Sequence, residues 1–435
     1  MPSIVCVFVI LSVAYYFVWA KKLELYLVFS LSVLVFLGFL SRILAFYFGD
    51  SSQLVQYLNV LLFLPVLVYG VLGLPRCLQN TKLVLIAPIL VVLTVYGILG
   101  INNSVKAALF DFLSYAMFFL IPVFVVVYNL KVELLLSYTI RSVTIIMVLA
   151  IIYGLPQFFL GPNAMDSHWM VTSEFSIIGL PLPFLVKTFS FFASPGHLAS
   201  FCLVYMIMVA AWLNKFEVRP RSALVKALII VVLGLVLLVV TGVRSVLVLY
   251  VVFMLRVMFS SRVFAIVTVA GMLVVVQALA PSIGDSDLSR IVDRLSSFNE
   301  VLSGNDNSAN TRLETLQKVY PEIEAWPIGH GLGSSGRYSI GDFTNIDNGY
   351  IDIMYELGVI FLPFIVLYLL VNVGFSFRYK NKRNTMLSDL SVMSGISLLA
   401  LMLVGGILQL NIALYFSLFI GMNSSLDFWR RRSVT

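Results

Sequence analysis

Long apolar runs recur along almost the whole of this 435-residue chain. Hydrophobic residues make up 60% of the sequence, charged residues make up only 11%, and the mean hydropathy is +1.02. A soluble domain carries about 25% charged residues, so one water-soluble core cannot hide this much apolar surface. The runs are continuous rather than alternating, which favours membrane-spanning helices of about 20 residues over a β-barrel. The sequence therefore predicts an all-α polytopic membrane protein.

About thirteen runs are long enough to be transmembrane spans, and a count of twelve also fits. The last two are separated only by the region of Gly405 and Gly406, so they form either a hairpin or one kinked helix. Met1–Ala20 precedes two lysines without a signal-peptidase pattern, which predicts a retained helix. We expect one transmembrane domain over residues 1–435. The expected spans are roughly 3–20, 24–47, 54–74, 83–100, 108–128, 138–160, 192–213, 227–242, 245–260, 263–280, 349–374, 388–406 and 408–425.

The positive charges are distributed unevenly between the two sides of this layout. Most of the 28 lysines and arginines fall in short loops on one side, which should be cytoplasmic, and this placement argues against a nucleic-acid partner. Two longer loops, 161–191 and 281–348, then face outward, and the second is partly helical by its residue spacing. Arginines on the outward side are not needed to set the topology, so they are candidates for function. They are Arg244, Arg290, Arg294, Arg312 and Arg337.

Two of these arginines have specific settings. Arg244 lies in the tight turn Thr241–Ser245, where an arginine at membrane depth costs about 2.5–3.5 kcal/mol unless it is paired or hydrated. It either extends to the lipid headgroups or binds an anion, since a guanidinium matches phosphate oxygens. Arg312 lies in a stretch with helical spacing and is either a surface residue or part of a positive pocket with Arg290 and Arg294. Asp287 and Asp293 are the alternative partners of those two arginines.

The outward loop 281–348 ends in two motifs. The string Gly329-His330-Gly331-Leu332-Gly333 is too rich in glycine for a helix and would bring backbone N–H groups close to an anion, although it is neither a P-loop nor a dinucleotide fingerprint. Asp347-Asn348 stands where the chain re-enters the membrane. Asp347 would accept a proton from a substrate hydroxyl, or the pair would cap a helix. Glu356 is expected to be a hydrogen-bonding group inside the bundle.

Metal and hydrolase chemistry have no support in the sequence. Cys6, Cys77 and Cys202 lie in or beside spans without ligand spacing, so neither a disulfide framework nor a zinc site is expected. The three histidines are not clustered with acidic residues, and His197 lies at the outward end of a span. No serine-hydrolase elbow is present. We expect a metal-independent protein without a cofactor.

Taken in order, several motifs resemble the superfamily of bacterial O-antigen polymerases and O-antigen ligases. The resemblance covers about residues 190–375, roughly the second half of the layout, and the motifs are moderately specific only as a set. They are Phe192–Ala199 with His197, Thr241–Ser245 with Arg244, Arg312 before Pro327–Gly333, and Asp347-Asn348-Gly349-Tyr350 before Glu356–Ile360.

The resemblance implies a GT-C-like membrane glycosyltransferase with its active site in loop 281–348, at the outer face of the bacterial inner membrane. Donor and acceptor would be glycans on undecaprenyl diphosphate. The other partners would be membrane lipids and, in some systems, a chain-length regulator protein. Arg244 and Arg312 match the two arginines that would hold the diphosphate, and Asp347 or His330 would be the base. The substrate-binding residues would be Arg290, Arg294, His197, Asn348, Tyr350 and Arg337.

Three functions remain in competition. Ligases typically carry a histidine where this chain has Asp347, which favours a polymerase of repeat units for O-antigen, capsule or exopolysaccharide. An O-antigen ligase is the first alternative. A polysaccharide flippase is the second, but a transporter should place charges deep inside several spans, whereas these spans are nearly free of charge.

Overall fold

The computed structural model is helical throughout its described part. It describes residues 2–49, 53–78, 80, 82–172, 188–215, 221–260, 307–335, 346, 348–379, 385–403 and 412–432. The first half holds α1 (Pro2–Trp19), α2 (Leu23–Phe48), α3 (Gln53–Cys77), α4 (Ile86–Gly100), α5 (Val105–Val127), α6 (Val132–Phe159) and α7 (Ala164–Thr172). The second half holds α8 (Pro195–Lys215), α9 (Arg221–Thr241), α10 (Arg244–Ser260), α13 (Asn307–Ala325), α14 (Gly349–Leu357), α15 (Leu362–Tyr379), α16 (Thr385–Leu401) and α17 (Ala413–Arg432).

The prediction of an all-α polytopic membrane protein is confirmed. Six described helices are long and apolar enough to cross a bilayer, namely α1, α2, α3, α5, α6 and α8. Shorter apolar helices run among them in α4, α9, α10, α15 and α16. The total number of spans stays a prediction, because the expected span 263–280 lies outside the described residues.

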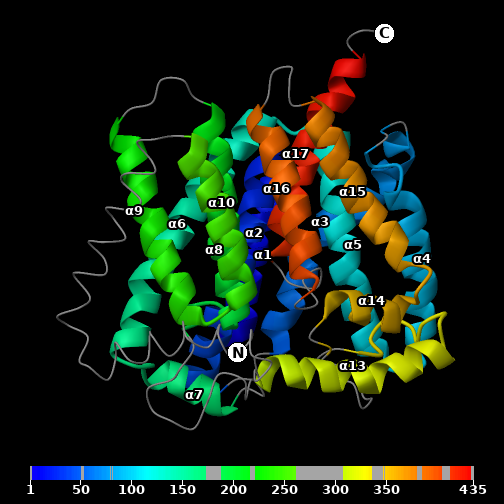
Figure 1. Cartoon of the computed structure of the whole chain (residues 1–435), viewed down its shortest axis with the longest axis horizontal. Coiled ribbons are helices and arrows are strands. Elements are labelled where there is room, and N and C mark those ends of the chain that lie inside the picture. The colour runs from blue at the N-terminus through cyan, green and yellow to red at the C-terminus, as the bar shows by residue number, and fades with distance from the viewer. Residues whose placement is uncertain are drawn as a thin grey trace.

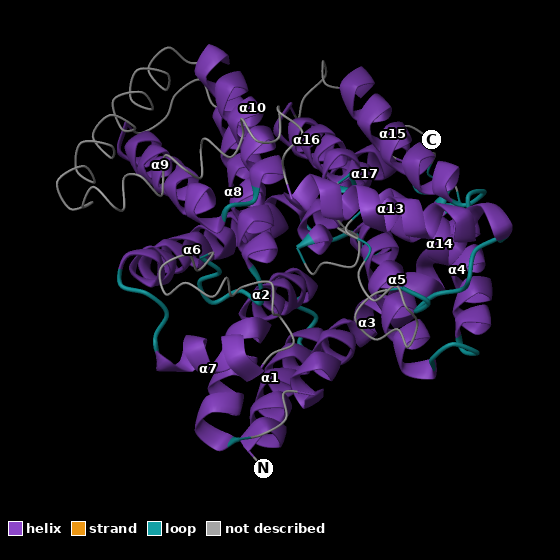
Figure 2. Ribbon diagram, turned by 60° about the horizontal axis from the view of Figure 1, so that its bottom comes forward, coloured by secondary structure: helices purple, strands orange, loops and turns teal. Residues whose placement is uncertain are grey.

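The helices alternate in direction, so the bundle has two distinct ends. The chain begins at one end, which also carries α7, α13 and α14, and the C-terminus lies at the opposite end (Figure 1). We call the first of these the α13 end. Figure 2 turns it toward the reader and shows α13 lying across the ends of the upright helices. Lys21, Lys22 and Lys131 lie at the opposite end, which has the charge pattern expected of a cytoplasmic face.

α5 is the central helix of the half of the bundle that carries the glycine-rich segment. Nearly all of its second half is buried, and it packs against α3, α4 and α17. α1, by contrast, exposes large apolar side chains such as Phe8 and Trp19, as expected of a helix that faces lipid. The packing of α5 therefore fixes the position of its first turns, which lie at the α13 end.

The expected span 349–374 is wrong as a single helix. Gly358 adopts φ 82° and ends α14 after nine residues, and α15 starts at Leu362 with Pro363 in its first turn. A side chain at Gly358 would collide with the carbonyl oxygen of Ile328. The break therefore makes room for the glycine-rich segment, and α14 is too short to span a bilayer.

The last two expected spans form a hairpin rather than one kinked helix. α16 ends at Leu401 and α17 begins at Ala413, and the two helices pack against each other. Gly405 and Gly406 lie outside the described residues. So do residues 281–306 and 336–345 of the outward loop, whose described part consists of α13, the segment after it, Ile346 and Asn348.

Candidate active site

The segment Gly329–Ser335, called here the glycine-rich loop, inserts between α14, α4 and α5. The N–H of His330 donates to the Tyr355 carbonyl at 2.9 Å, and that of Gly331 donates to the Glu356 carbonyl at 2.9 Å. The N–H of Leu332 donates to the Tyr96 carbonyl of α4 at 3.0 Å. The loop thus closes the end of α14, whose last carbonyls would otherwise lack partners.

Glycine is required at two positions of this loop. Gly331 and Gly333 have φ angles of 93° and 76°, which other residues rarely adopt. A Cβ at Gly331 would lie 2.6 Å from the Gly100 nitrogen, and one at Gly333 would lie 2.5 Å from the Ala108 nitrogen. The string is therefore glycine-rich because it runs against the backbones of α4 and α5.

The loop does not offer its N–H groups to an external anion. Gly329 donates to the Trp326 carbonyl and Ser334 to the Gly331 carbonyl, while Gly333 and Ser335 donate to the Glu356 carboxyl at 3.1 and 3.4 Å. With the three bonds to α14 and α4, every backbone N–H from Gly329 to Ser335 has an acceptor inside the protein. The expectation of an anion cradle in this string is wrong, because the anionic group that the string meets is the side chain of Glu356.

Three carboxyl groups gather beneath the loop. Glu356 is fully buried, and Asp352 on α14 and Asp111 on α5 are nearly so. The Ser335 hydroxyl donates to Asp352 Oδ1 at 2.5 Å, and Asp111 lies close enough to Glu356 for their charges to repel. Glu356 is thus the interior hydrogen-bonding group that its position suggested.

Burial raises the pKa of two carboxyl groups in this cluster. Burial raises the pKa of Asp352 to about 6, against a smaller lowering by the Ser335 hydrogen bond. Burial, followed by the charges of Asp111 and Asp352, raises the pKa of Glu356 well above its usual range. In the described part of the chain, neither Glu356 nor Asp111 forms an ion pair with a lysine or arginine. Within that same part, no group of acidic, histidine or cysteine residues has the arrangement of a metal site.

Of the two expected bases, His330 and Asp347, the structure describes only His330. Its ring is half-buried and stacks on Tyr355 with the centroids 4.4 Å apart, and Asn103 donates to its carbonyl at 3.0 Å. Its Nε2 has no hydrogen-bond partner among the described residues. This nitrogen is also buried, so no described group occupies it but it is not open to a ligand in this conformation. Asp347, the other expected base, lies outside the described residues.

Asn348 and Tyr350 position α14. The Asn348 side chain accepts hydrogen bonds from the N–H groups of Tyr350 and Ile351 at 3.0 and 3.3 Å, which is the geometry of a helix N-cap. Its amide donates to the Leu403 carbonyl, and the Tyr350 hydroxyl donates to the Leu399 carbonyl at 2.6 Å. Asn348 is therefore a helix cap, as one of the two alternatives expected. Asn348 and Tyr350 together hold α14 against the end of α16.

The other expected site residues are described only in part. His197 lies in the first turn of α8, where its Nδ1 contacts the Ser194 hydroxyl at 2.7 Å. Arg244 is the first residue of α10, two positions after Gly242, which has φ 70°. By helical spacing, position 312 lies on the same face of α13 as Val319 and Ile323. Val319 and Ile323 pack against α14. The side chains of Arg244 and Arg312 lie outside the described residues, as do Arg290, Arg294 and Arg337.

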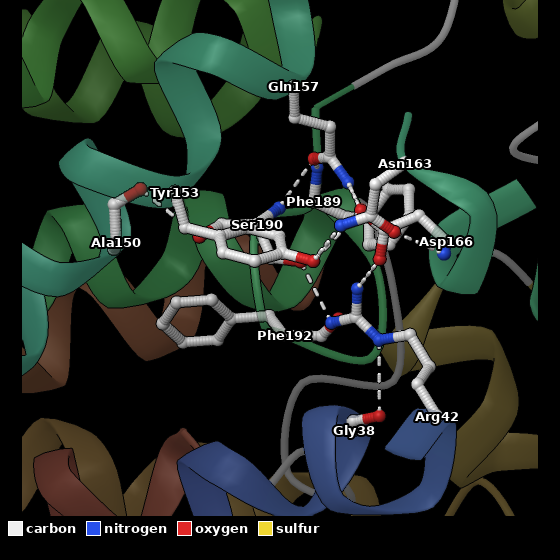
Figure 3. Close-up of polar contacts among 10 residues, drawn as sticks. All are labelled: Gly38, Arg42, Ala150, Tyr153, Gln157, Asn163, Asp166, Phe189, Ser190 and Phe192. Carbon is white, nitrogen blue, oxygen red and sulfur yellow. Dashed lines mark hydrogen bonds and ion pairs between the residues drawn. The ribbon is translucent and has the colours of Figure 1, made fainter. Parts of the chain in front are cut away.

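A second polar network, which the sequence analysis missed, lies elsewhere at the α13 end. Arg42 of α2 and Asp166 of α7 form a buried ion pair, and Gln157 and Tyr153 of α6 also donate to Asp166 (Figure 3). Arg42 further donates to the carbonyls of Ser190 and Phe192 at 2.8 and 2.9 Å. The network holds α7 and the segment leading to His197 against the bundle.

The sequence analysis selected charged residues of the outward loops as candidates, and it therefore missed Arg42, Asp111 and Asp352, which lie in helices. The available signal was a single charge in an otherwise apolar run, since such a residue inside a membrane helix is expensive and usually paired. Arg42 and Asp111 also correct the expectation that these spans are nearly free of charge. Both lie within two turns of the helix end at the α13 end, and neither is deep in the bundle.

The comparison with protein families matches one segment in the second half of the chain. The family described as O-antigen ligase matches residues 229–366, a segment that includes the start of α10, α13, the glycine-rich loop and α14. Members of this family are membrane enzymes of the glycosyltransferase kind, acting as ligases or polymerases. No curated protein matches the chain. Residues 229–366, on a bundle that includes six candidate membrane-spanning helices among its described residues, are thus similar to the O-antigen ligase family.

Proposed function

We propose that this protein polymerises oligosaccharide repeat units carried on undecaprenyl diphosphate, at the outer leaflet of the bacterial inner membrane. One observation carries the proposal. Motifs far apart in the sequence meet at one end of the bundle, where the first turns of α8 and α10, helix α13, the glycine-rich loop and α14 all lie (Figure 1). The charge pattern of the opposite end supports an outward orientation for the α13 end.

The chemistry needs a stabilised leaving group and a base. The acceptor sugar hydroxyl loses its proton and its oxygen bonds to the anomeric carbon of the donor, while the bond to the diphosphate breaks and undecaprenyl diphosphate leaves with the electron pair. Arg244 and Arg312 would stabilise the charge that develops on the diphosphate. The energy resides in the lipid diphosphate linkage, so the reaction needs no nucleotide.

His330 and Asp347 are the two proposed bases. The unpartnered Nε2 of His330 supports the histidine, since a general base needs a nitrogen that no protein group already occupies. Asp347 directly precedes Asn348, the N-cap of α14, in the sequence. The two variants His330→Gln and Asp347→Asn distinguish them, because only loss of the base should remove the acidic limb of the pH–rate profile, where the base becomes protonated.

An O-antigen ligase is the second candidate, favoured by the printed description of the matched family. A ligase would transfer a finished polymer to a different acceptor, whereas a polymerase would transfer it to another repeat unit. Asp347 stands where ligases typically carry histidine, which supports the polymerase.

The decisive genetic test is the glycan profile of a deletion strain complemented with wild type, Arg312→Ala or Asp347→Ala. A polymerase predicts a ladder for wild type and a single repeat unit for the deletion and both variants. Lys318→Ala is the matched control, because Lys318 is exposed on the same helix as Arg312. Long polymer retained on undecaprenyl diphosphate in the deletion strain would refute the polymerase and indicate a ligase, and repeat units trapped on the cytoplasmic leaflet would indicate a flippase.

A further inference from the structure

Glu356 plays the part in the glycine-rich loop that a bound anion would play in a phosphate loop. Its Oε1 accepts the N–H groups of Gly333 and Ser335, and its backbone carbonyl accepts that of Gly331. One residue of α14 thus receives three of the N–H groups that shape the loop. The loop adopts its fold against Glu356 without a ligand.

The second carboxyl oxygen of Glu356, Oε2, lacks a hydrogen-bond donor among the described residues. This oxygen is buried, and the Asp111 carboxyl lies near enough to repel a charge on the same side chain. Two carboxylates cannot hydrogen-bond to each other, since ionised carboxyl groups only accept. A single proton shared between Glu356 and Asp111 satisfies both groups and removes the repulsion between them.

We propose that Glu356 is a positioning residue, which in its proton-sharing form with Asp111 fixes the glycine-rich loop and so presents His330 to the site. Its effect on activity rests on the proposed function, whereas its effect on the loop does not. Glu356 touches no reacting atom in this account. Its side chain acts through Gly333 and Ser335, and its backbone carbonyl acts through Gly331.

Among the described residues, the ionisable groups near Glu356 come from four elements. Asp111 of α5 and Asp352 of its own helix are close enough to repel it, and His330 of the loop stacks its imidazole on the neighbouring Tyr355. Tyr96 of α4 donates its hydroxyl to the Ile328 carbonyl and so does not reach the carboxyl. The carboxyl groups therefore dominate the charge balance around Glu356.

A pair of variants separates this role from a catalytic one. In Glu356→Gln, the amide oxygen still accepts from Gly333 and Ser335, and the amide N–H donates to an ionised Asp111, which reproduces the shared proton. In Glu356→Ala, two buried N–H groups lose their acceptor. A catalytic acid or base would fail in both variants, whereas a positioning residue fails only in the second.

Ser334 provides a readout of the loop that needs no activity. It is 8% exposed and its hydroxyl has no hydrogen-bond partner among the described residues, so Ser334→Cys removes no hydrogen bond that they make. The rate at which a maleimide labels this cysteine in membranes measures how often the loop opens. The parent chain, which has three native cysteines, supplies the background, and Glu322→Ala is the control because Glu322 is an exposed carboxyl on α13.

The experiment combines Ser334→Cys with each Glu356 variant and records labelling and polymer formation. We expect labelling to rise about tenfold or more in Glu356→Ala, since buried donors are left unsatisfied, and to stay near the parent rate in Glu356→Gln. Polymer should fall at least tenfold in Glu356→Ala, stay within about threefold in Glu356→Gln, and not change in Glu322→Ala.

Three results would overturn the inference. Slow labelling in Glu356→Ala would show that the carboxyl does not hold the loop. Fast labelling in Glu356→Gln would show that an ionised carboxylate, not a shared proton, is required. Unchanged polymer in Glu356→Ala, despite an open loop, would show that the loop does not position the site. If the parent chain made no polymer at all, the proposed function would fail, and the labelling rates would still decide the role of Glu356.

Discussion

Arg42 Nη1 and Asp166 Oδ1 lie 2.5 Å apart in the interior, although 124 residues separate them in the chain. Neither side chain is exposed by more than 1%. The guanidinium also packs against the Phe189 ring, with its carbon 4.8 Å from the ring centroid. This pair ties α2 to α7 and to the backbone that leads into α8, so the α13 end is held by a charged contact as well as by apolar packing.

Removing one partner of this pair should destabilise the protein strongly. Asp166→Ala leaves a buried guanidinium without its counter-charge, a change that typically costs about 3–5 kcal/mol. The expected result is a clear fall in the unfolding temperature of the detergent-purified protein. The double variant Arg42→Met/Asp166→Leu should recover much of that loss, because no uncompensated charge remains. An unfolding temperature of Asp166→Ala equal to that of wild type would contradict the structural role.

A methyl group at Gly333 should damage the loop, whereas one at Gly374 should not. Gly333 has a positive φ and approaches the Ala108 backbone, while a Cβ at Gly374 in α15 meets no atom within 4 Å. The left-handed conformation alone costs a non-glycine residue about 1–2 kcal/mol. We expect Gly333→Ala to lower the unfolding temperature and polymer yield, with Gly374→Ala neutral or slightly stabilising. Equal behaviour of the two variants would be inconsistent with the close approach.

Replacements at Asn348 should follow capping ability. Its side chain accepts from the N–H groups of Tyr350 and Ile351, a role that aspartate fills as well as asparagine. Asn348→Asp keeps the cap but cannot donate to the Leu403 carbonyl, so its stability should fall between wild type and Asn348→Ala, which should lose about 1 kcal/mol. The unfolding temperature and polymer yield should rank together as wild type, then aspartate, then alanine. Loss of activity in a fully stable Asn348→Asp would instead indicate that the amide binds substrate.

The loop should open as the pH rises. Burial raises the pKa of Asp352 to about 6, so the folded state binds its proton more tightly than the unfolded chain does. The resulting stability is fully present below the ordinary value of about 3.9 and is lost as the pH rises through the folded value. Labelling of Ser334→Cys should therefore accelerate between about pH 4 and pH 7. The same cysteine with Asp352→Asn corrects for ionisation of the thiol, and a constant ratio between the two proteins would contradict the prediction.

Local sequence signals predicted most of the helices. Apolar runs set the spans, and the Asx-type cap at Asn348 was one of two stated alternatives. The break at Gly358 was missed, because the apolar character continues through it into α15. The Cβ clash with Ile328 that requires glycine there involves a residue outside the helix. A hydropathy pattern carries no information about such a contact.

The contacts that build the site depend on tertiary structure. Asp111 meets Glu356 only because α5 and α14 pack at the same end, and the glycine-rich loop finds its internal anion only in that arrangement. Sequence alone showed that the string could approach an anion, and not that the anion belongs to the protein. Arg42 was visible as a charge in an apolar run, but its partner Asp166 lies in a short helix that no periodic pattern predicted.

The central claim is best tested with the purified protein in liposomes that contain a repeat unit on undecaprenyl diphosphate. The account predicts a ladder of lengthening products, release of undecaprenyl diphosphate for every linkage, and rates lower by about 10²–10³-fold in Arg244→Ala and Arg312→Ala. Lys318→Ala should match wild type. A wild-type protein that consumes no repeat unit, or arginine variants that lengthen the glycan at the wild-type rate, would contradict the account.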